Sequence, residues 1–216
     1  MSKPFTWDKL TLLLTCFVAV GPIGGCASSP APSSLPSSMQ TESIEKNAAS
    51  FDAILKTAVK GENVDYGALV GNDELRQYLR WMEDVDLESM PTKEARLAFY
   101  INAYNALTLN SVLEYWPTIK SVANVVPDFG FFKTKKHRVA KRAVTLDELE
   151  NKIIRPEFKD PRIHAALNCA SRSCPPLASF AFKAGELDSQ LDDVFRRFAN
   201  DTKRNHINIQ DGTVSI

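Results

Sequence analysis

The sequence has no excess of charge of either sign. Its 216 residues include 26 lysines and arginines and 26 aspartates and glutamates, so the formal net charge is zero. Proteins that hold nucleic acid through its phosphates carry a basic excess on the binding domain. We therefore expect no nucleic-acid partner.

Long apolar runs and internal repeats are also missing. The apolar run over residues 10–20 is too short to cross a bilayer, which takes about 20 apolar residues in a helix. No segment recurs at a fixed period, which argues against a solenoid or a propeller. The remaining length and its 44% apolar content suit one ordinary domain with a buried core.

Cysteine and histidine are scarce, with four and three residues respectively. Structural zinc sites are recognised in a sequence by two pairs of ligands at short spacing. Beyond Cys169 and Cys174, the sequence has no CxxC or HxxxH pair that could complete such a site. The sequence therefore favours neither a metal centre nor a bound cofactor.

The first 25 residues have the pattern of an export signal. Lys3 and Lys9 make a weakly basic start, the short apolar run follows, and the segment closes on Gly24-Gly25-Cys26. Small residues before a cysteine resemble the lipobox of bacterial lipoproteins, which implies a diacylated Cys26 as the new N-terminus. An ordinary cleaved signal that happens to contain Cys26 is the alternative.

Residues 26–41 are predicted to tether the domain to that anchor. Residues 27–39 contain three prolines and six serines and almost nothing that could pack. Such a stretch stays extended and reaches up to ~40 Å at about 3 Å per residue. In the lipoproteins that this segment resembles, a residue such as Ala27 after the cysteine implies sorting to the outer membrane. We expect a lipid-anchored protein on the periplasmic side of the envelope.

Residues 42–216 are predicted to form a helix-rich α+β domain. The segment 93–116 is apolar nearly all round, which predicts a buried central helix. Three flanking segments have an amphipathic helical period: 42–60, 73–82 and 185–199. Alternation predicts a small antiparallel sheet built from hairpins over 135–144 and 206–216 and a strand over 162–168. Thr145 and Glu148 have capping-box spacing and open a helix that should end before Pro156.

Three segments within this domain resemble the DUF547 family. They are residues 99–107, 145–150 and 160–176, and residues 64–66 fit the family's N-terminal region. The resemblance covers about residues 45–216 and implies no settled activity. Similar members continue beyond the last strand into an aromatic-rich segment, so the resemblance suggests a truncated end at Ile216.

The densest chemistry lies in 160–176, where three interpretations stay open. Cys169 and Cys174 can form a local disulfide in an oxidising compartment. Alternatively, one of them is a nucleophile with His164 as its base. In an extended strand Cys169 would lie roughly 16 Å from His164, five residues away, and its side chain would point to the opposite face. Cys174 is better placed, because the loop before it can fold back toward His164. The third interpretation is a metal site made by the same three residues, with His137 or His206 as a further ligand.

Polar residues of the same region are expected to line a binding wall. One face of the predicted strand carries the polar residues Arg162, His164 and Asn168. These side chains require polar partners if they are buried. Asn102 and Asn105 lie three residues apart on the central helix, where an unpartnered amide would be costly. We expect them to bind the backbone of the 168–176 loop. A catalytic role as an orienter or oxyanion donor is the alternative.

Six basic residues lie within 133–142, and His137 lies among them. Such a run is usually a solvated hairpin edge, where lysine deters aggregation. The sharper hypothesis is a contact with anionic envelope polymers or lipid headgroups.

Two classes of function follow from the sequence. The first is a binding or structural lipoprotein stabilised by a loop disulfide. The second is a cysteine-type hydrolase or transferase that acts on envelope peptides through Cys174 or Cys169 with His164. Whether the protein is an enzyme stays undecided at this point.

Overall fold

A computed structural model describes residues 37–208 and 213–215. The predicted signal peptide, Cys26 and most of the predicted tether lie outside the described residues. For residues 37, 38, 40, 206–208 and 213–215 only the backbone is described.

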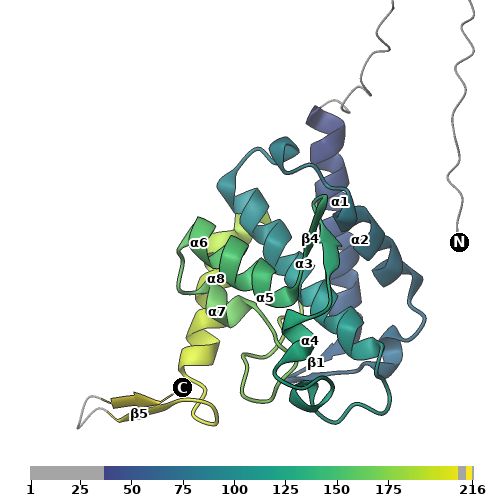
Figure 1. Ribbon diagram of the computed structural model, residues 1–216. Coiled ribbons are helices and arrows are strands. Elements are labelled where there is room, and N and C mark those ends of the chain that lie inside the picture. The colour runs from purple at the N-terminus through teal and green to yellow at the C-terminus, as the bar shows by residue number, and fades with distance from the viewer. Residues whose placement is uncertain (1–36, 209–212, 216) are drawn as a thin grey trace, which may run out of the picture. The chain divides into compact units, whose positions relative to one another are not determined.

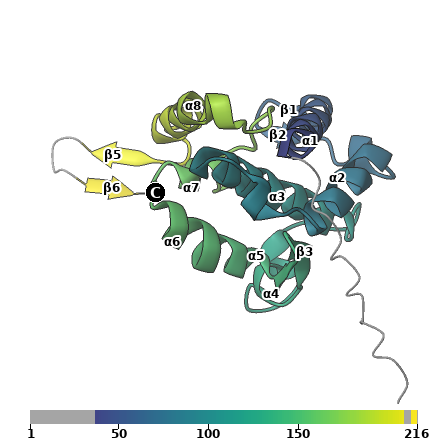
Figure 2. The same ribbon diagram turned by 90° about the horizontal axis from the view of Figure 1, so that it is seen from above.

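The central helix is α3, Lys93–Leu113. Thr92 caps its first turn by accepting a hydrogen bond from the Ala95 N–H at 3.0 Å. Nearly every side chain from 95 to 112 is buried, because neighbouring elements surround the helix. In Figures 1 and 2, α1 (Ser37–Ala58), α2 (Asp73–Glu83) and α8 (Leu187–Ala199) lie around it. The predicted buried central helix is confirmed.

Shorter helical pieces complete the helical part of the described chain. The 3-10 turns are η1 (Gly67–Leu69), η2 (Leu87–Ser89), η3 (Val122–Asn124) and η5 (Ala184–Glu186), and the short α-helices are α4 (Gly130–Lys133), α5 (Leu146–Glu148), α6 (Arg155–Phe158) and α7 (Ile163–Ala166). None of the helices in the described part of the chain combines the length and the apolarity that crossing a membrane requires.

The described strands form separate antiparallel hairpins. They are β1 (Val59–Lys60) with β2 (Asn63–Val64), β3 (His137–Val139) with β4 (Arg142–Val144), and β5 (His206–Asn208) with β6 (Thr213–Ser215). The second and third match the predicted hairpins, and the α+β class is confirmed. The first hairpin was not predicted, because the helical period was expected to run through residue 60; instead Gly61 turns the chain between two strands at φ +64°.

The predicted strand over 162–168 is wrong. Residues 163–166 form the single helical turn α7, in which Leu167 N–H donates to the Ile163 carbonyl at 3.2 Å. Asp160 starts the turn by accepting from the Arg162 N–H at 2.9 Å. Buried residues at 163 and 165–167 fit either a short strand or one helical turn, so alternation could not separate the two.

The helix that begins after Thr145 runs further than predicted. The capping box between Thr145 and Glu148 is present in both directions. Beyond it the chain passes through a π-helical stretch, Leu149–Ile154, and continues as α6 through Pro156. Pro156 is tolerated because it lies in the first turn of α6, where its missing N–H costs little.

Candidate functional site

The motif loop, residues 168–182, leaves α7 and is held at its start by Asn105. The Asn105 side chain, 2% exposed, donates to the Ala166 carbonyl at 2.9 Å and accepts from the Asn168 N–H at 2.9 Å. One buried amide thus satisfies two backbone groups that have left helical geometry. This is the backbone contact predicted for the asparagine pair.

Asn102 holds the other end of the motif loop through its backbone. It donates to the Phe182 carbonyl at 2.8 Å and accepts from the Phe182 N–H at 2.9 Å. The expectation that Asn102 would bind within 168–176 is therefore wrong in position. Asp52 on α1 accepts from the neighbouring Ala181 N–H at 3.1 Å. Side chains from two helices therefore fix both ends of the loop.

The middle of the motif loop is closed on itself. Asn168 donates from its amide to the Pro175 carbonyl at 2.8 Å, and its Oδ1 accepts from the Ala170 N–H at 3.0 Å. The Sγ atoms of Cys169 and Cys174 lie at bonding distance, with their Cα atoms 6.2 Å apart. In this form neither sulfur is a free thiol.

His164 lies on the exposed side of α7. Its ring packs edge-on against Phe198, with centroids 5.6 Å apart, and its Nδ1 lies 3.2 Å from Arg155 Nη2. Partial burial and the Arg155 charge lower the pKa of His164, so its ring is neutral at pH 7. The contacts of this ring are with an aromatic ring and a guanidinium, and none of them is with a cysteine.

Metal ligation finds no support in the described residues, which contain no group of three or more His, Cys, Asp or Glu side chains arranged to hold an ion. His137 was expected at the surface, but it is only 8% exposed. Burial, and then the nearby Lys135 charge, lower its pKa to about 4. The side chain of His206 lies outside the described residues.

Arg162 links α7 to α8. Its guanidinium pairs with Asp160 at 2.7 Å, Asp188 at 2.8 Å and Asp192 at 2.5 Å. Three carboxylates around one guanidinium satisfy its donors. Arg162 therefore positions the motif region rather than offering a free charge to a ligand.

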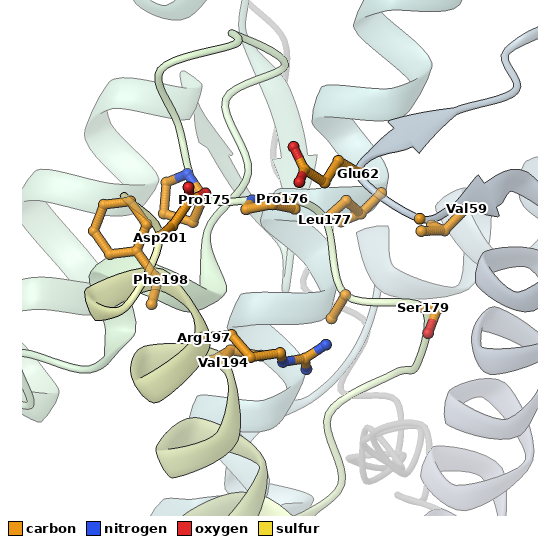
Figure 3. Close-up of a pocket in the computed structure, with 13 residues that line it drawn as sticks. Val59, Glu62, Pro175, Pro176, Leu177, Ser179, Val194, Arg197, Phe198 and Asp201 are labelled. Atoms are coloured by element: carbon orange, nitrogen blue, oxygen red, sulfur yellow. The ribbon is translucent and has the colours of Figure 1, made fainter. Parts of the chain in front are cut away.

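A first hollow of about 510 Å³ opens along the motif loop. Pro175, Pro176 and Leu177 form one wall, and Phe198 on α8 forms part of another. Figure 3 shows Arg197 extending from α8 toward the loop and Glu62 approaching from the β1–β2 turn. The hollow is therefore lined by apolar and polar groups together, with charges of both signs among them.

A second hollow of about 460 Å³ lies on the other side of Glu62. It shares Glu62, Pro176 and Leu177 with the first, and Asn168 and Arg172 are among its own lining residues. We call the two hollows together the loop groove. The loop carrying Cys174 is part of its wall.

Ion pairs fix the charged residues at this edge. Glu62 binds Lys203 and Arg204, each at 3.1 Å, and these contacts hold the pKa of the Glu62 carboxyl below its usual value. Arg204 also donates to the Arg172 carbonyl at 3.0 Å and pairs with Asp201. Glu62 thus stays ionised, and the segment that follows α8 is tied to the motif loop.

Four of the six basic residues within 133–142, a segment that runs from the end of α4 into the β3–β4 hairpin, are paired with acidic neighbours. The pairs are Lys135 with Glu114, Lys136 with Glu148, Arg138 with Asp84 and Lys141 with Asp86. The hairpin is therefore less positive than its sequence indicates.

Sequence reasoning missed most of the groove's charged residues. Glu62, Arg197 and Asp201 lie far from the motif along the chain and join it only by folding. No spacing or pattern marks them, since charged residues on a turn and on an amphipathic helix are ordinary.

Comparison with known proteins bears on the family. The family model described as "Protein of unknown function, DUF547" matches residues 87–199, just over half of the chain. No curated protein and no solved structure matches the chain. The matched region contains α3, α7, the motif loop and all of α8, and so includes both asparagine contacts.

Proposed function

This chain belongs to the DUF547 family, and from that premise we propose that it is a lipid-anchored envelope protein that acts by binding. Its ligand site is the loop groove. A short peptide with side chains of both signs is the ligand class that suits the groove, because Arg197 and Glu62 place opposite charges among its apolar side chains. The exposed ion pairs Arg197–Asp193 and Glu62–Lys203 are weak enough to exchange with a charged ligand.

The observation that supports binding over thiol chemistry is the pairing of Cys169 with Cys174. A cysteine nucleophile requires a free thiolate with a base at hydrogen-bonding distance. Here each sulfur is engaged by the other, and His164 contacts Arg155 and Phe198 instead. The motif loop is held at both ends, and a loop that is rigid before binding loses less conformational entropy when a ligand binds.

A thiol titration of the full chain, purified without reductant, tests this choice. With Cys26 acylated and the signal removed, we expect no reactive thiol from Cys169 or Cys174, even after unfolding. Two reactive thiols would favour the cysteine-type hydrolase or transferase, with Cys174 or Cys169 and His164 as its residues.

Cell fractionation of Cys26→Ser tests the anchor. The Gly24-Gly25-Cys26 pattern motivates the expectation that this variant loses acylation and either leaves the membrane fraction or keeps its signal. An acylated, membrane-bound Cys26→Ser product would refute the anchor while leaving the groove untouched.

A labelled Ala-Glu-Lys peptide tests the groove itself, by fluorescence anisotropy with the full chain. Ser179 is exposed and lines the first hollow, so Ser179→Trp should fill it and abolish binding. Ser189→Trp is the matched control, since Ser189 is also exposed and lies outside the groove. Equal peptide binding by both variants would contradict the assignment.

The 133–142 hairpin is proposed as a secondary contact with anionic lipid headgroups or envelope polymers. Its basic residues cluster within ten positions, and Arg142 has no acidic partner among the described residues. Because most of its neighbours are paired, this contact should be weak and sensitive to salt.

A further inference from the structure

Exposed apolar side chains gather at one place outside the loop groove. The large apolar residues that are exposed in the described chain are Met39, Val70, Tyr115, Trp116, Phe129 and Phe195. Val70 and Trp116 line the same hollow, of about 490 Å³, and Tyr115 is the next residue along. Apolar groups grouped at a hollow mark a binding surface more often than scattered ones do.

The Trp116 ring is held as a platform. Trp116 is 40% exposed, and Tyr66 packs on its ring with ring centroids 5.6 Å apart and a tilt of 34°. Tyr66 also lines the second hollow of the loop groove. The aromatic pair therefore stands between the loop groove and the 490 Å³ hollow, which we call the Trp116 hollow.

Planar polar side chains surround this platform. They belong to Asn72, Arg76, Asn110 and Glu114. Asn72 uses its Oδ1 to cap α2, accepting from the Leu75 N–H at 2.7 Å, which leaves the Nδ2 donor of the same amide for a ligand. Asn110 donates to Glu114 at 3.3 Å across the exposed edge of the hollow.

The charges at the hollow are already balanced. Arg76 pairs with Asp73, and Glu114 pairs with Lys135. An ionic ligand would have to displace these partners, whereas a neutral, hydroxyl-rich ligand could accept and donate hydrogen bonds without doing so. An apolar floor, made by Leu69 and Leu75, supports the less polar face of such a ligand.

We propose that the Trp116 hollow binds a neutral oligosaccharide. The C–H face of one sugar ring stacks on the exposed indole, and its hydroxyls bond to the amides of Asn72 and Asn110. The hollow's volume lies within the ~300–1,000 Å³ typical of ligand sites. The site is separate from the loop groove and does not require the groove to bind a peptide.

Titration of the full chain with a neutral N-acetylglucosamine tetrasaccharide tests this proposal. Saturable binding should change the tryptophan fluorescence, and calorimetry should give the affinity. Trp116→Ala should weaken binding by about tenfold or more, the usual weight of one aromatic contact. Asn110→Ala should weaken it several-fold, and its exposed position keeps the fold intact.

Two controls separate this site from others. Trp81→Phe removes an indole that lines a different pocket and should leave the fluorescence response unchanged. Ser179→Trp fills the loop groove and should leave tetrasaccharide affinity unchanged, so failure of one site is distinguishable from failure of the other. Affinity should also be unaffected by salt, because the ligand is neutral.

Three outcomes would overturn the proposal. One is the absence of saturable tetrasaccharide binding at millimolar concentration. Another is full affinity in both Trp116→Ala and Asn110→Ala. The third is that the Ala-Glu-Lys peptide competes with the tetrasaccharide and that Trp116→Ala abolishes this peptide binding. That result would make the Trp116 hollow a peptide subsite.

Discussion

Replacing Asn105 by alanine should destabilise the domain strongly. The side chain is 2% exposed, and its loss removes two hydrogen bonds of 2.9 Å to the backbone. The Ala166 carbonyl and the Asn168 N–H are then left without their partner. Each stranded group costs about 1–3 kcal/mol, so Asn105→Ala should lower the free energy of unfolding by about 3 kcal/mol.

The loop should respond more than the rest of the fold. Arg172 is exposed in the motif loop, so a loosened loop start should speed tryptic cleavage after Arg172 before global unfolding. Urea unfolding followed by circular dichroism measures the stability, and mass spectrometry identifies the cut.

The same helix offers a comparison and a control. Asn102→Ala breaks the matching pair of bonds to Phe182 and should cost a similar amount. The double variant should lose less than the sum, because both amides hold one loop. Asn110→Ala removes only an exposed bond and should stay within about 0.5 kcal/mol of the parent. If Asn105→Ala unfolds at the parent's urea midpoint, the argument from buried amides is wrong.

Three further predictions follow from the described side chains. The pKa of His137 is about 4 in the folded protein and 6.5 in its reference state, so the unfolded chain binds more protons between pH 6.5 and pH 4. The free energy of unfolding should therefore fall by up to about 3 kcal/mol from pH 7 to pH 4. In urea titrations, His137→Phe should make this free energy depend less steeply on pH. Cys169→Ser should lower the free energy of unfolding by about 2 kcal/mol, the entropy of closing a six-residue loop; an unchanged urea midpoint would mean that the pair is not bonded. The 133–142 hairpin should bind anionic liposomes only at low salt and release them where the Debye length is ~8 Å; absence of sedimentation even at low salt would leave it as a solvated edge.

Where local signals agreed, the sequence was sufficient to place the elements. The segment 93–116 is apolar on every face, and only a helix surrounded by other elements can bury such a surface. The box between Thr145 and Glu148 is a four-residue interaction that forms within one turn. The alternation over 135–144 predicted the β3–β4 hairpin for the same reason.

Short segments were ambiguous because two structures satisfy them. Residues 163–166 alternate well enough for a strand, yet they form a helical turn whose start is set by Asp160. The expectation that Arg162, His164 and Asn168 share one face depended on strand parity, which does not apply to a helical turn. A four-residue window contains too few positions to separate a period of 2 from one of 3.6.

The sequence by itself determined the balance of charge, the central helix, the β3–β4 and β5–β6 hairpins and the family to which the motif loop belongs. Tertiary structure alone decided which groups meet at a site. Glu62 and Arg197 come from a turn and a helix far apart along the chain, and they flank the loop groove only after both pack around it. Tyr66 and Trp116 likewise become one platform only across two segments. The physical reason is that capping and periodicity act over a few residues, whereas a binding site is made by contacts between distant segments, which no local pattern records.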